Sequence, residues 1–487
     1  MIRPQCLVIL ALSVLAYPCF GEISLEDALG GFDNEEYENE QSEPEIDPIG
    51  SELSDLDDIL GEFDISNETP ITVTEPPAII EGDTPSVRLS GSIRQKFIVN
   101  FSHEAPATGE IDHRGLSSVS TRLDLELESK LANDFRVLLT GNFVLDPIHP
   151  KQTSPGRTSM VANTSDYELE LGEAFIQGPL TDSIDLTFGR QIVVWGRSDQ
   201  FRITDILNPV DYRNPGLTDI KDLRLPVTMA RFDLYSGSWS SSLILVPERR
   251  FDMTPGPGSD YYFGPVPLPP REYPGGQFGK PDIAFALTGT FSGWDLSFYT
   301  ARLLNRNPYI ELGQDGPKRK HQRITMFGSA ANLVVGSWLI KGEIAVHKDL
   351  RFSNVPDRDF QKFTALAGIE YSGIVDTTLA FEVTSSHISD FDNRLTAQPD
   401  SRKENESAIA FRIGRTFLND SLDLTMAAMA PTPIGDNGGL ARTQVTYDLN
   451  DSVELYGGVL LYFKGKKLPY NKIADNDRLF LGLNYHF

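Results

Sequence analysis

The chain has 487 residues and a formal net charge of −26, with 43 Lys and Arg against 69 Asp and Glu. A chain this acidic repels a phosphate backbone, so we expect no nucleic-acid partner. The two cysteines, Cys6 and Cys19, stand near the N-terminus, and no stretch after residue 21 approaches the roughly 18 apolar residues of a spanning helix. A mature chain without cysteine would have neither disulfides nor thiolate chemistry.

The first 21 residues, MIRPQCLVILALSVLAYPCFG, have the layout of a secretory signal. One early arginine, Arg3, precedes an apolar run over residues 7–16, and small residues follow. Gly21 marks the expected cleavage point. We therefore expect residues 1–21 to be removed from the mature chain.

Residues 22–85 form an acidic segment with 21 Asp and Glu and no Lys or Arg. Such a segment repels itself and buries little, which predicts a disordered tail, located in the periplasm. A nine-residue pattern, L-x-D-x-L-G-x-F-D, occurs in it twice. At helical spacing its leucines and phenylalanine share one face, which predicts a docking motif that folds on a periplasmic protein. The alternative is a chance echo in low-complexity sequence. The six positions are Leu25, Leu29, Phe32, Leu56, Leu60 and Phe63.

From residue 86 onward, apolar and polar residues alternate along several stretches, including 87–101, 122–130 and 453–464. A closed membrane barrel turns one face to lipid and the other to the lumen, although a soluble sandwich produces the same alternation. Three tryptophans each follow a short Gly-containing turn, as the interfacial aromatic girdle of a membrane barrel would place them. They are Trp239, Trp294 and Trp338.

Turn signals divide residues 86–487 into strands. Eight short turns alternate with nine longer loops. This predicts an all-β fold, namely a transmembrane antiparallel β-barrel of about 18 strands, with 16 also possible. The N-terminal and C-terminal ends of the barrel sequence would then both lie on the short-turn side, in the periplasm. The short turns are expected near 132–134, 181–183, 236–238, 292–293, 336–337, 372–374, 419–420 and 450–451. The loops are expected near 104–116, 148–165, 198–225, 249–281, 304–320, 350–360, 389–405, 431–438 and 465–476.

The last stretch, residues 478–487, places apolar residues on one parity and ends on an aromatic residue. It resembles the C-terminal strand of Gram-negative outer-membrane β-barrels, which the barrel-assembly machinery reads as a signal. The resemblance implies that Leu483, Tyr485 and Phe487 form this signal and that outer-membrane lipid surrounds the barrel. The alternative is the edge strand of a soluble sandwich.

Residues 189–196 read GRQIVVWG, and an N-P-x-D segment follows at 208–211. Both features resemble a large, mostly uncharacterised family of proteobacterial outer-membrane barrels with a GRQ-x-x-x-WG strand. The resemblance is sharp over about 185–232 and covers 86–487 in layout. It implies a porin-like barrel, and some members are encoded near lipid-export or hydrophobic-compound systems.

Arg190 in this motif falls on the parity that faces lipid, where a bare arginine costs about 2–4 kcal/mol near mid-depth. A bulge at Gly189 would turn it inward. We expect an arginine in the lumen, which either pairs with carboxylates or contacts the solute.

Residues 197–225 mix apolar side chains with evenly spread charges of both signs. This composition predicts a segment that folds into the lumen and constricts it, where irregular backbone is shielded from lipid. The alternative is an extracellular loop with a short helix at 219–223. The candidate constriction residues are Arg190, Gln191, Trp195, Arg197, Asp205, Asn208, Asp211, Arg213, Asp222 and Arg224.

Together these features favour an outer-membrane channel or transport barrel for a small or lipophilic solute, coupled through its tail to a periplasmic partner. One alternative is a plugged scaffold for binding or assembly without flux. Another is an outer-membrane hydrolase, for which Ser385 and His387 are the closest pair on one strand face. Because no catalytic motif or metal-ligand spacing is visible, we expect no enzymatic activity, no metal and no cofactor.

Overall fold

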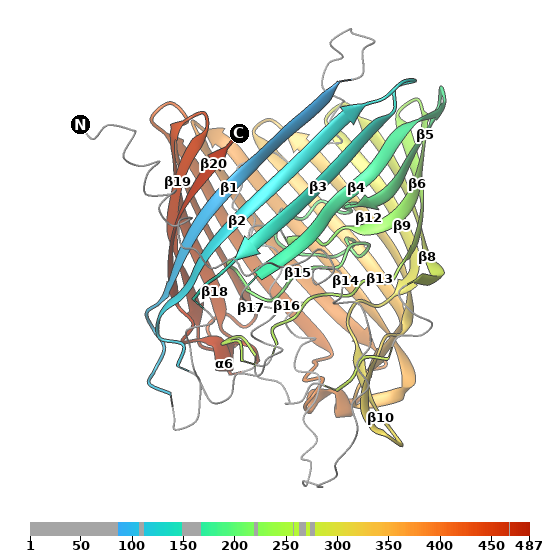
Figure 1. The fold of residues 1–487 in the computed structure, drawn as a ribbon. Coiled ribbons are helices and arrows are strands. Elements are labelled where there is room, and N and C mark those ends of the chain that lie inside the picture. The colour runs from blue at the N-terminus through green and yellow to red at the C-terminus, as the bar shows by residue number, and fades with distance from the viewer. Residues whose placement is uncertain are drawn as a thin grey trace, which may run out of the picture. The chain divides into compact units, whose positions relative to one another are not determined.

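The computed structural model describes residues 86–106, 112–148, 167–218, 223–256, 258–262, 269–272, 278–466 and 468–487. The predicted signal, the acidic tail and both docking motifs lie outside these residues. The described chain forms an 18-stranded antiparallel sheet. Strand β1 (Val87–Asn100) pairs with β2 (Gly115–Lys130) and with β20 (Arg478–His486), which closes the sheet into a barrel (Figure 1). The predicted barrel and its count of 18 strands are confirmed.

The remaining wall strands follow one another around the barrel in chain order. A separate hairpin, β10 and β11, lies outside the barrel sheet. In the described part of the chain, the helices η3 (Asn393–Thr396) and α6 (Tyr470–Ile473) are short, and no helix is long and apolar enough to cross a membrane. The strands are β3 (Arg136–Leu145), β4 (Tyr167–Thr181), β5 (Ile184–Gln191), β6 (Val227–Ser236), β7 (Trp239–Glu248), β8 (Phe278–Phe291), β9 (Trp294–Leu304), β10 (Tyr309–Gly313), β11 (Gly316–Lys320), β12 (Arg323–Val335), β13 (Trp338–Phe352), β14 (Val355–Ile374), β15 (Thr377–Ser389), β16 (Asn405–Phe417), β17 (Leu422–Pro431), β18 (Gly439–Asn450) and β19 (Val453–Phe463).

All eight short turns lie at or within a few residues of their predicted positions, the one expected at 372–374 falling slightly later, between Ile374 and Thr377. The loop predicted at 350–360 is wrong. There β13 runs on to Phe352, β14 begins at Val355, and these two residues pair. The register shifts twice in this stretch, and Val355 and Phe360 are buried in a small apolar cluster, so the ladder continues although the regular alternation has ended.

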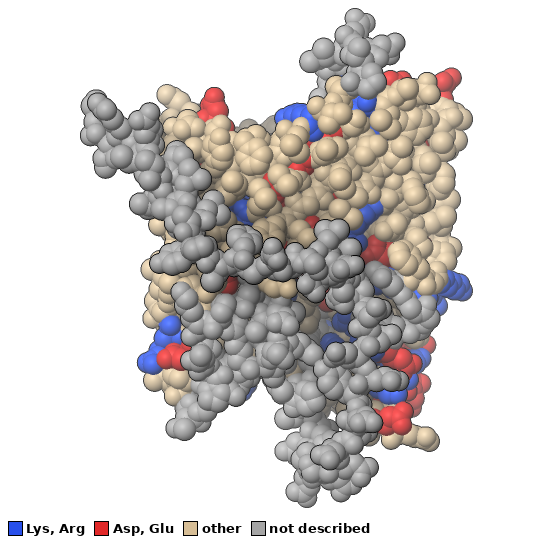
Figure 2. All heavy atoms as spheres, in the orientation of Figure 1, with Lys and Arg blue, Asp and Glu red and all other residues tan. Residues whose placement is uncertain are grey.

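The outer face of the wall is apolar, because alternate residues of each strand point outward. The visible wall in Figure 2 carries few charged residues between the two ends, and Lys, Arg, Asp and Glu gather near the lower rim, on the side of the long loops. The three predicted girdle tryptophans stand at the first positions of β7, β9 and β13 and are exposed. The exposed side chains include Leu89, Phe97, Phe143, Phe298, Phe327, Ile344, Phe381 and Phe411.

The final strand has the predicted division of faces. Leu481, Tyr485 and Phe487 are exposed on the outer parity, while Phe480 and Asn484 are buried on the lumen side. The register of β20 against β1 places this apolar row in line with the outer face of the first strand. Closure of the barrel therefore depends on the last residues of the chain.

Strands β5 and β6 stop together on the long-loop side. The ladder between β5 and β6 ends at the pair Gln191 and Val227, while the neighbouring strand β4 extends further toward the long-loop side. Between these two residues the chain leaves the wall. Residues 192–226, called the lumen segment below, contain the candidate site.

Candidate functional site

Asn208, the asparagine of the N-P-x-D segment, ties the two ends of the lumen segment together. Its side-chain oxygen accepts the N–H of Val193 (2.8 Å), and its amide nitrogen donates to the carbonyls of Gln191 (3.1 Å) and Leu225 (3.0 Å). The residue is fully buried. An amide carries both a donor and an acceptor, so one asparagine satisfies backbone groups of both chains where the strand ladder stops.

The middle of the lumen segment reaches the opposite wall. Glu343 on β13 accepts the N–H groups of Arg197 and Ser198 (2.7 Å for Ser198) and the hydroxyl of Thr204 (3.0 Å). Glu382 on β15 accepts the hydroxyl of Ser198 (2.6 Å). Two buried carboxyl groups of the far wall thus bind a tight turn of the lumen segment.

Two ion pairs add to this attachment. Lys341 on β13 binds Asp199, and Arg197 binds Asp295 on β9 with its Nε 2.8 Å from the carboxylate. Trp195 packs its ring on Tyr299 of β9, with centroids 4.8 Å apart. The turn is therefore held by an aromatic contact and by charges of both signs.

Further along, the lumen segment lies against a third part of the wall. Three polar side chains, on β1, β18 and β19, donate to its carbonyl oxygens. Together with the contacts to β9, β13 and β15, these bonds hold the lumen segment across the barrel, from one side of the wall to the other. They are Lys96 to Leu217 (3.0 Å), Arg442 to Gly216 (3.1 Å) and the Tyr462 hydroxyl to Pro215.

A buried carboxylate, Asp205, lies between two arginines of the lumen segment. Its Oδ2 is 3.2 Å from Nε of Arg202 and 3.0 Å from Nε of Arg224. Burial raises the pKa of Asp205, but the two guanidiniums outweigh burial and bring its pKa below the ordinary value. Asp205 is therefore ionised at neutral pH.

A second ion cluster joins the lumen segment to β4. Arg213 lies 2.6 Å from the carboxylate of Asp211 and 3.0 Å from that of Glu168. Burial lowers the pKa of Arg213, but the two carboxylates outweigh it and raise the pKa above its ordinary value. The cation is thus permanent and fixes its part of the segment to the wall.

The lumen segment lies between two cavities. One, of about 290 Å³, is lined by Asp205 and by residues of the long loops such as Asp400 and Asn437. The other, of about 700 Å³, is lined by Arg224 and by residues near the short turns, such as Ser452. Because the bonded pair Asp205 and Arg224 contributes one residue to each cavity, this ion pair stands at the boundary between them.

The predicted constriction residues divide into three groups. Asp205, Asn208, Asp211, Arg213 and Arg224 line one of the two cavities. Arg190, Gln191, Trp195 and Arg197 line neither, and Gln191 is buried with its amide nitrogen 3.3 Å from the carbonyl of Met229. Asp222, with most of the alternative helix at 219–223, lies outside the described residues.

Arg190 has turned inward from its lipid parity. Its Nη1 lies 2.9 Å from Glu248 of β7, and its Nε donates to the carbonyl of Leu171 on β4 (3.0 Å). The pairing of β5 with both neighbours has no register shift at this point, so the expected bulge is replaced by a backbone twist at Gly189, whose φ is +133°. A Cβ at Gly189 would meet the carbonyl oxygen of Ala174 at 2.3 Å, so the site requires glycine.

The residues considered for hydrolysis, Ser385 and His387, share the outer parity of β15 with the exposed Phe381. The Ser385 hydroxyl lies 2.9 Å from that of Ser407, and His387 Nδ1 lies 3.0 Å from the side-chain oxygen of Asn405. This geometry gives the serine no general base within the described contacts.

Sequence reasoning missed the wall residues that hold the lumen segment. Lys341, Glu343 and Glu382 all lie on the lumen parity of their strands, and this alternation was the available signal. Parity shows that a side chain faces the lumen, but it does not show which chain it meets there.

The closed sheet, the apolar outer face and the segment in the lumen define a transmembrane β-barrel of the porin type. The chain belongs to the family described as proteins of unknown function, DUF1302, whose model matches residues 99–487. No curated protein matches the sequence.

Three bacterial proteins are among the solved structures to which this chain is similar. OccAB1 of Acinetobacter baumannii shares 10% identity at a TM-score of 0.50, over 82% of this chain and 96% of that one. OccK9 (OpdG) of Pseudomonas aeruginosa shares 13% at 0.50, over 82% and 98%. OpdK of Pseudomonas aeruginosa, solved with vanillate, shares 9% at 0.49, over 82% and 98%.

Proposed function

We propose that this protein is an outer-membrane channel for a small solute, and that the lumen segment sets the narrowest point of its path. The observation that carries this proposal is the placement of the segment, with a cavity of about 290 Å³ on the long-loop side and one of about 700 Å³ on the short-turn side. A barrel of this size has a lumen wide enough for both a segment and an aqueous path. The fold shared with outer-membrane proteins supports this location.

The ion pair between Asp205 and Arg224 is the proposed constriction. Charged pairs at the boundary of two aqueous cavities select by size and charge, because a solute must displace the partners or pass beside them. Arg202 and Arg213 place further positive charge next to this boundary, and Asp211 balances part of it. The path is therefore polar at its centre.

A plugged scaffold without flux has an observation in its favour as well. The lumen segment and the inward faces of β6 to β9 and β12 share one buried apolar core, which includes Leu207, Val227, Met229, Ile244 and Met326. A core of this kind resists opening. The two proposals differ in whether ions cross the barrel.

Electrical recording in planar lipid bilayers separates them. The purified full chain, folded as shown by its heat-modifiable migration in gels, is added to the bilayer under an applied voltage. Stepwise current increases are the result expected of a channel. Silence from barrels that are demonstrably inserted would contradict the channel and favour the scaffold.

The coupling of the channel to a periplasmic protein is proposed from the sequence alone. Both copies of the L-x-D-x-L-G-x-F-D pattern would bind one partner, with a short linker that raises the effective concentration of the second copy. Replacing Phe32 and Phe63 together should weaken binding more than either change alone. A pull-down with the peptide 22–85 that recovers no periplasmic protein would contradict this coupling.

A further inference from the structure

The wall of the barrel has an interruption beside β4. Strand β4 pairs with β3 from Tyr167 onward, but its pairing with β5 begins only at Ala174. Among the described residues, no strand pairs with residues 167–173 on the β5 side. Figure 1 shows β4 crossing the front of the barrel with β5 beside its upper part.

The strands that follow β4 stop at one level on the long-loop side. The pairing of β6 with β7 stops at Ala230 and Leu245, whereas β7 continues to Glu248 and pairs there with β8. Continued past this pair, the register places Val227 of β6 beside Glu248 of β7, so β5, β6 and β7 all end on one row. Among the described residues, β4 therefore extends past β5, β6 and β7, and its edge over residues 167–172 has no strand beside it on this side.

The interruption lies where the outer surface is apolar. Leu169 of β4 is 78% exposed, and Tyr167, Leu171 and, across the interruption, Phe278 of β8 are exposed too. An open sheet edge in contact with lipid is costly, because its N–H and C=O groups find no water. An open sheet edge is therefore expected in a membrane barrel only where other groups shield it from lipid or where it serves a function.

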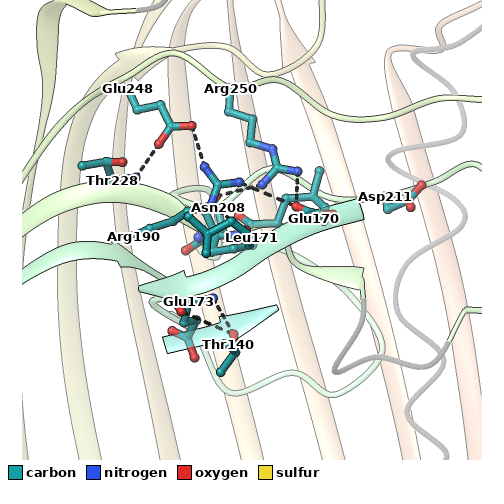
Figure 3. Close-up of polar contacts among 12 residues, drawn as sticks. Thr140, Glu170, Leu171, Glu173, Arg190, Asn208, Asp211, Thr228, Glu248 and Arg250 are labelled. Carbon is teal, nitrogen blue, oxygen red and sulfur yellow. Dashed lines mark hydrogen bonds and ion pairs between the residues drawn. The ribbon is translucent and has the colours of Figure 1, made fainter. Parts of the chain in front are cut away.

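Side chains, rather than backbone, close the interruption (Figure 3). Glu170 of β4 binds Arg250, which follows β7, and its Oε1 lies 3.6 Å from Nη2 of Arg190. Arg190 also reaches Glu248 at the end of β7, at 2.9 Å. These four residues, called the ion latch below, join β4 to β7 across the missing ladder, and they are mostly buried.

The space behind the ion latch is a cavity of the lumen. The cavity of about 700 Å³ is lined by Glu170 of the ion latch and by Ile192, Leu225 and Pro226 at the two ends of the lumen segment. The lining of this cavity is mostly polar and charged, and these three residues are among its few apolar members. Side-chain ion pairs can separate and form again while the barrel stays folded, whereas separating two paired strands breaks the barrel.

We propose that the interruption is a lateral portal, through which an amphipathic solute with a long apolar body passes between the lipid bilayer and the lumen. The ion latch keeps the portal closed when no solute is present. This inference rests on the proposed channel, since the portal leads into its lumen, and it names the solute class as one that partitions into lipid. The ion latch and the polar lumen bind the polar head group of the solute, and the exposed apolar residues beside the interruption contact its apolar chain.

Photolabelling with a long-chain alcohol that bears a diazirine on its alkyl chain tests the portal. The full chain is reconstituted into liposomes with the probe, irradiated, and mapped by mass spectrometry. We expect labels at Ile192 and Leu225 inside the cavity, and at Phe298 and Ile344 on the outer face of the uninterrupted wall, which serve as internal controls.

A chemical lock shows whether the probe entered from the side. Glu170→Cys and Arg250→Cys are joined by a short bifunctional thiol reagent, since both native cysteines lie in the expected signal. The lock should abolish the labels at Ile192 and Leu225 and preserve the outer ones. The matched control joins Arg302→Cys and Asp349→Cys, an ion pair that spans the unbroken ladder of β12, and should change no label.

The opposite change should open the portal. Arg190→Gln removes the cation between two carboxylates and is expected to increase the labels inside the cavity, while Arg302→Gln leaves them as they were. Heat-modifiable migration verifies that each variant is folded. Labels inside the cavity that survive the lock, or their absence from the folded wild type, would overturn the portal.

Bilayer recordings on the same preparations separate this inference from the proposed channel. A barrel that conducts ions but takes no label in the cavity would contradict the portal and leave the channel standing. A silent barrel whose labels inside the cavity disappear with the lock would support the portal and contradict the channel.

Discussion

The wall of this barrel differs between its two halves. From β12 to β20 each strand pairs with both neighbours along most of its length. Between β4 and β7 the ladder is cut short, and the chain that would have extended it lies in the lumen. The constriction and the proposed portal both arise from this single departure from the wall.

The difference shows what replaces a strand ladder. In the intact half, backbone groups satisfy one another. In the interrupted half, side chains satisfy backbone groups instead, since Asn208 binds backbone on both ends of the lumen segment and Glu343 binds the turn that it forms. Interactions that depend on one side chain are easily removed by a single substitution, which makes the comparison testable.

The largest effect is expected from the tryptophans, which occur in both environments. Trp195 in the lumen segment is 6% exposed and stacks on Tyr299, whereas Trp239 at the start of β7 is 37% exposed. Trp195→Ala should lower the free energy of unfolding by about 3–5 kcal/mol, since it empties a packed site. Trp239→Ala should lower the free energy of unfolding by a smaller amount. Denaturant titration in detergent micelles measures both, and equal losses would contradict a packed core in the lumen.

A comparable effect is expected at Asn208. Asn208→Ala leaves the N–H of Val193 and the carbonyl of Leu225 without their partner, at a cost of about 1–3 kcal/mol for each buried group. The matched control is Asn450→Ala, whose side chain accepts one bond from Ser452 in an exposed turn of the intact half. We expect limited proteolysis to cut the lumen segment of the Asn208 variant and not that of the control. Equal resistance of the two would show that Asn208 does not hold the segment.

The smallest effect concerns charge selection at the constriction. Asp205→Asn leaves Arg202 and Arg224 without the carboxylate between them, so the reversal potential in a salt gradient should move toward anion selectivity. The control is Asp436→Asn, an exposed residue that pairs with Lys466 in a long loop. An identical reversal potential for wild type and the Asp205 variant would place the ion path elsewhere.

The pH dependence of the wild-type reversal potential follows from the ion pair between Asp205 and Arg224. The pKa of Asp205 is depressed in the folded state, so its contribution to stability is present above the ordinary value of about 3.9 and is lost as the pH falls through the lower, folded value. We therefore expect the reversal potential to stay constant between pH 7 and pH 5. A shift within this range that the Asp205→Asn variant lacks would mean that Asp205 titrates there.

The alternation of side chains was sufficient to predict the barrel, its count of strands and its short turns, because one face of every strand meets lipid. It failed at 350–360, where the register between β13 and β14 shifts twice and Val355 and Phe360 pack in a small apolar cluster. Glu343 and Glu382 were missed, because alternation shows only that a side chain faces the lumen, and their partner is a segment far away in the sequence. The broken ladder beside β4 leaves no mark in the sequence, because Leu169 and Leu171 alternate there as in any wall strand.

The most direct test of the channel is the single-channel conductance of a barrel whose residues 204–222 are replaced by a short Gly/Ser linker. The control replaces residues 310–319 of the β10 and β11 hairpin, which lies outside the barrel sheet. If the lumen segment sets the narrowest point, conductance should rise in the first variant and stay at the wild-type level in the second. A folded first variant with unchanged conductance would contradict the placement of the constriction in the lumen segment.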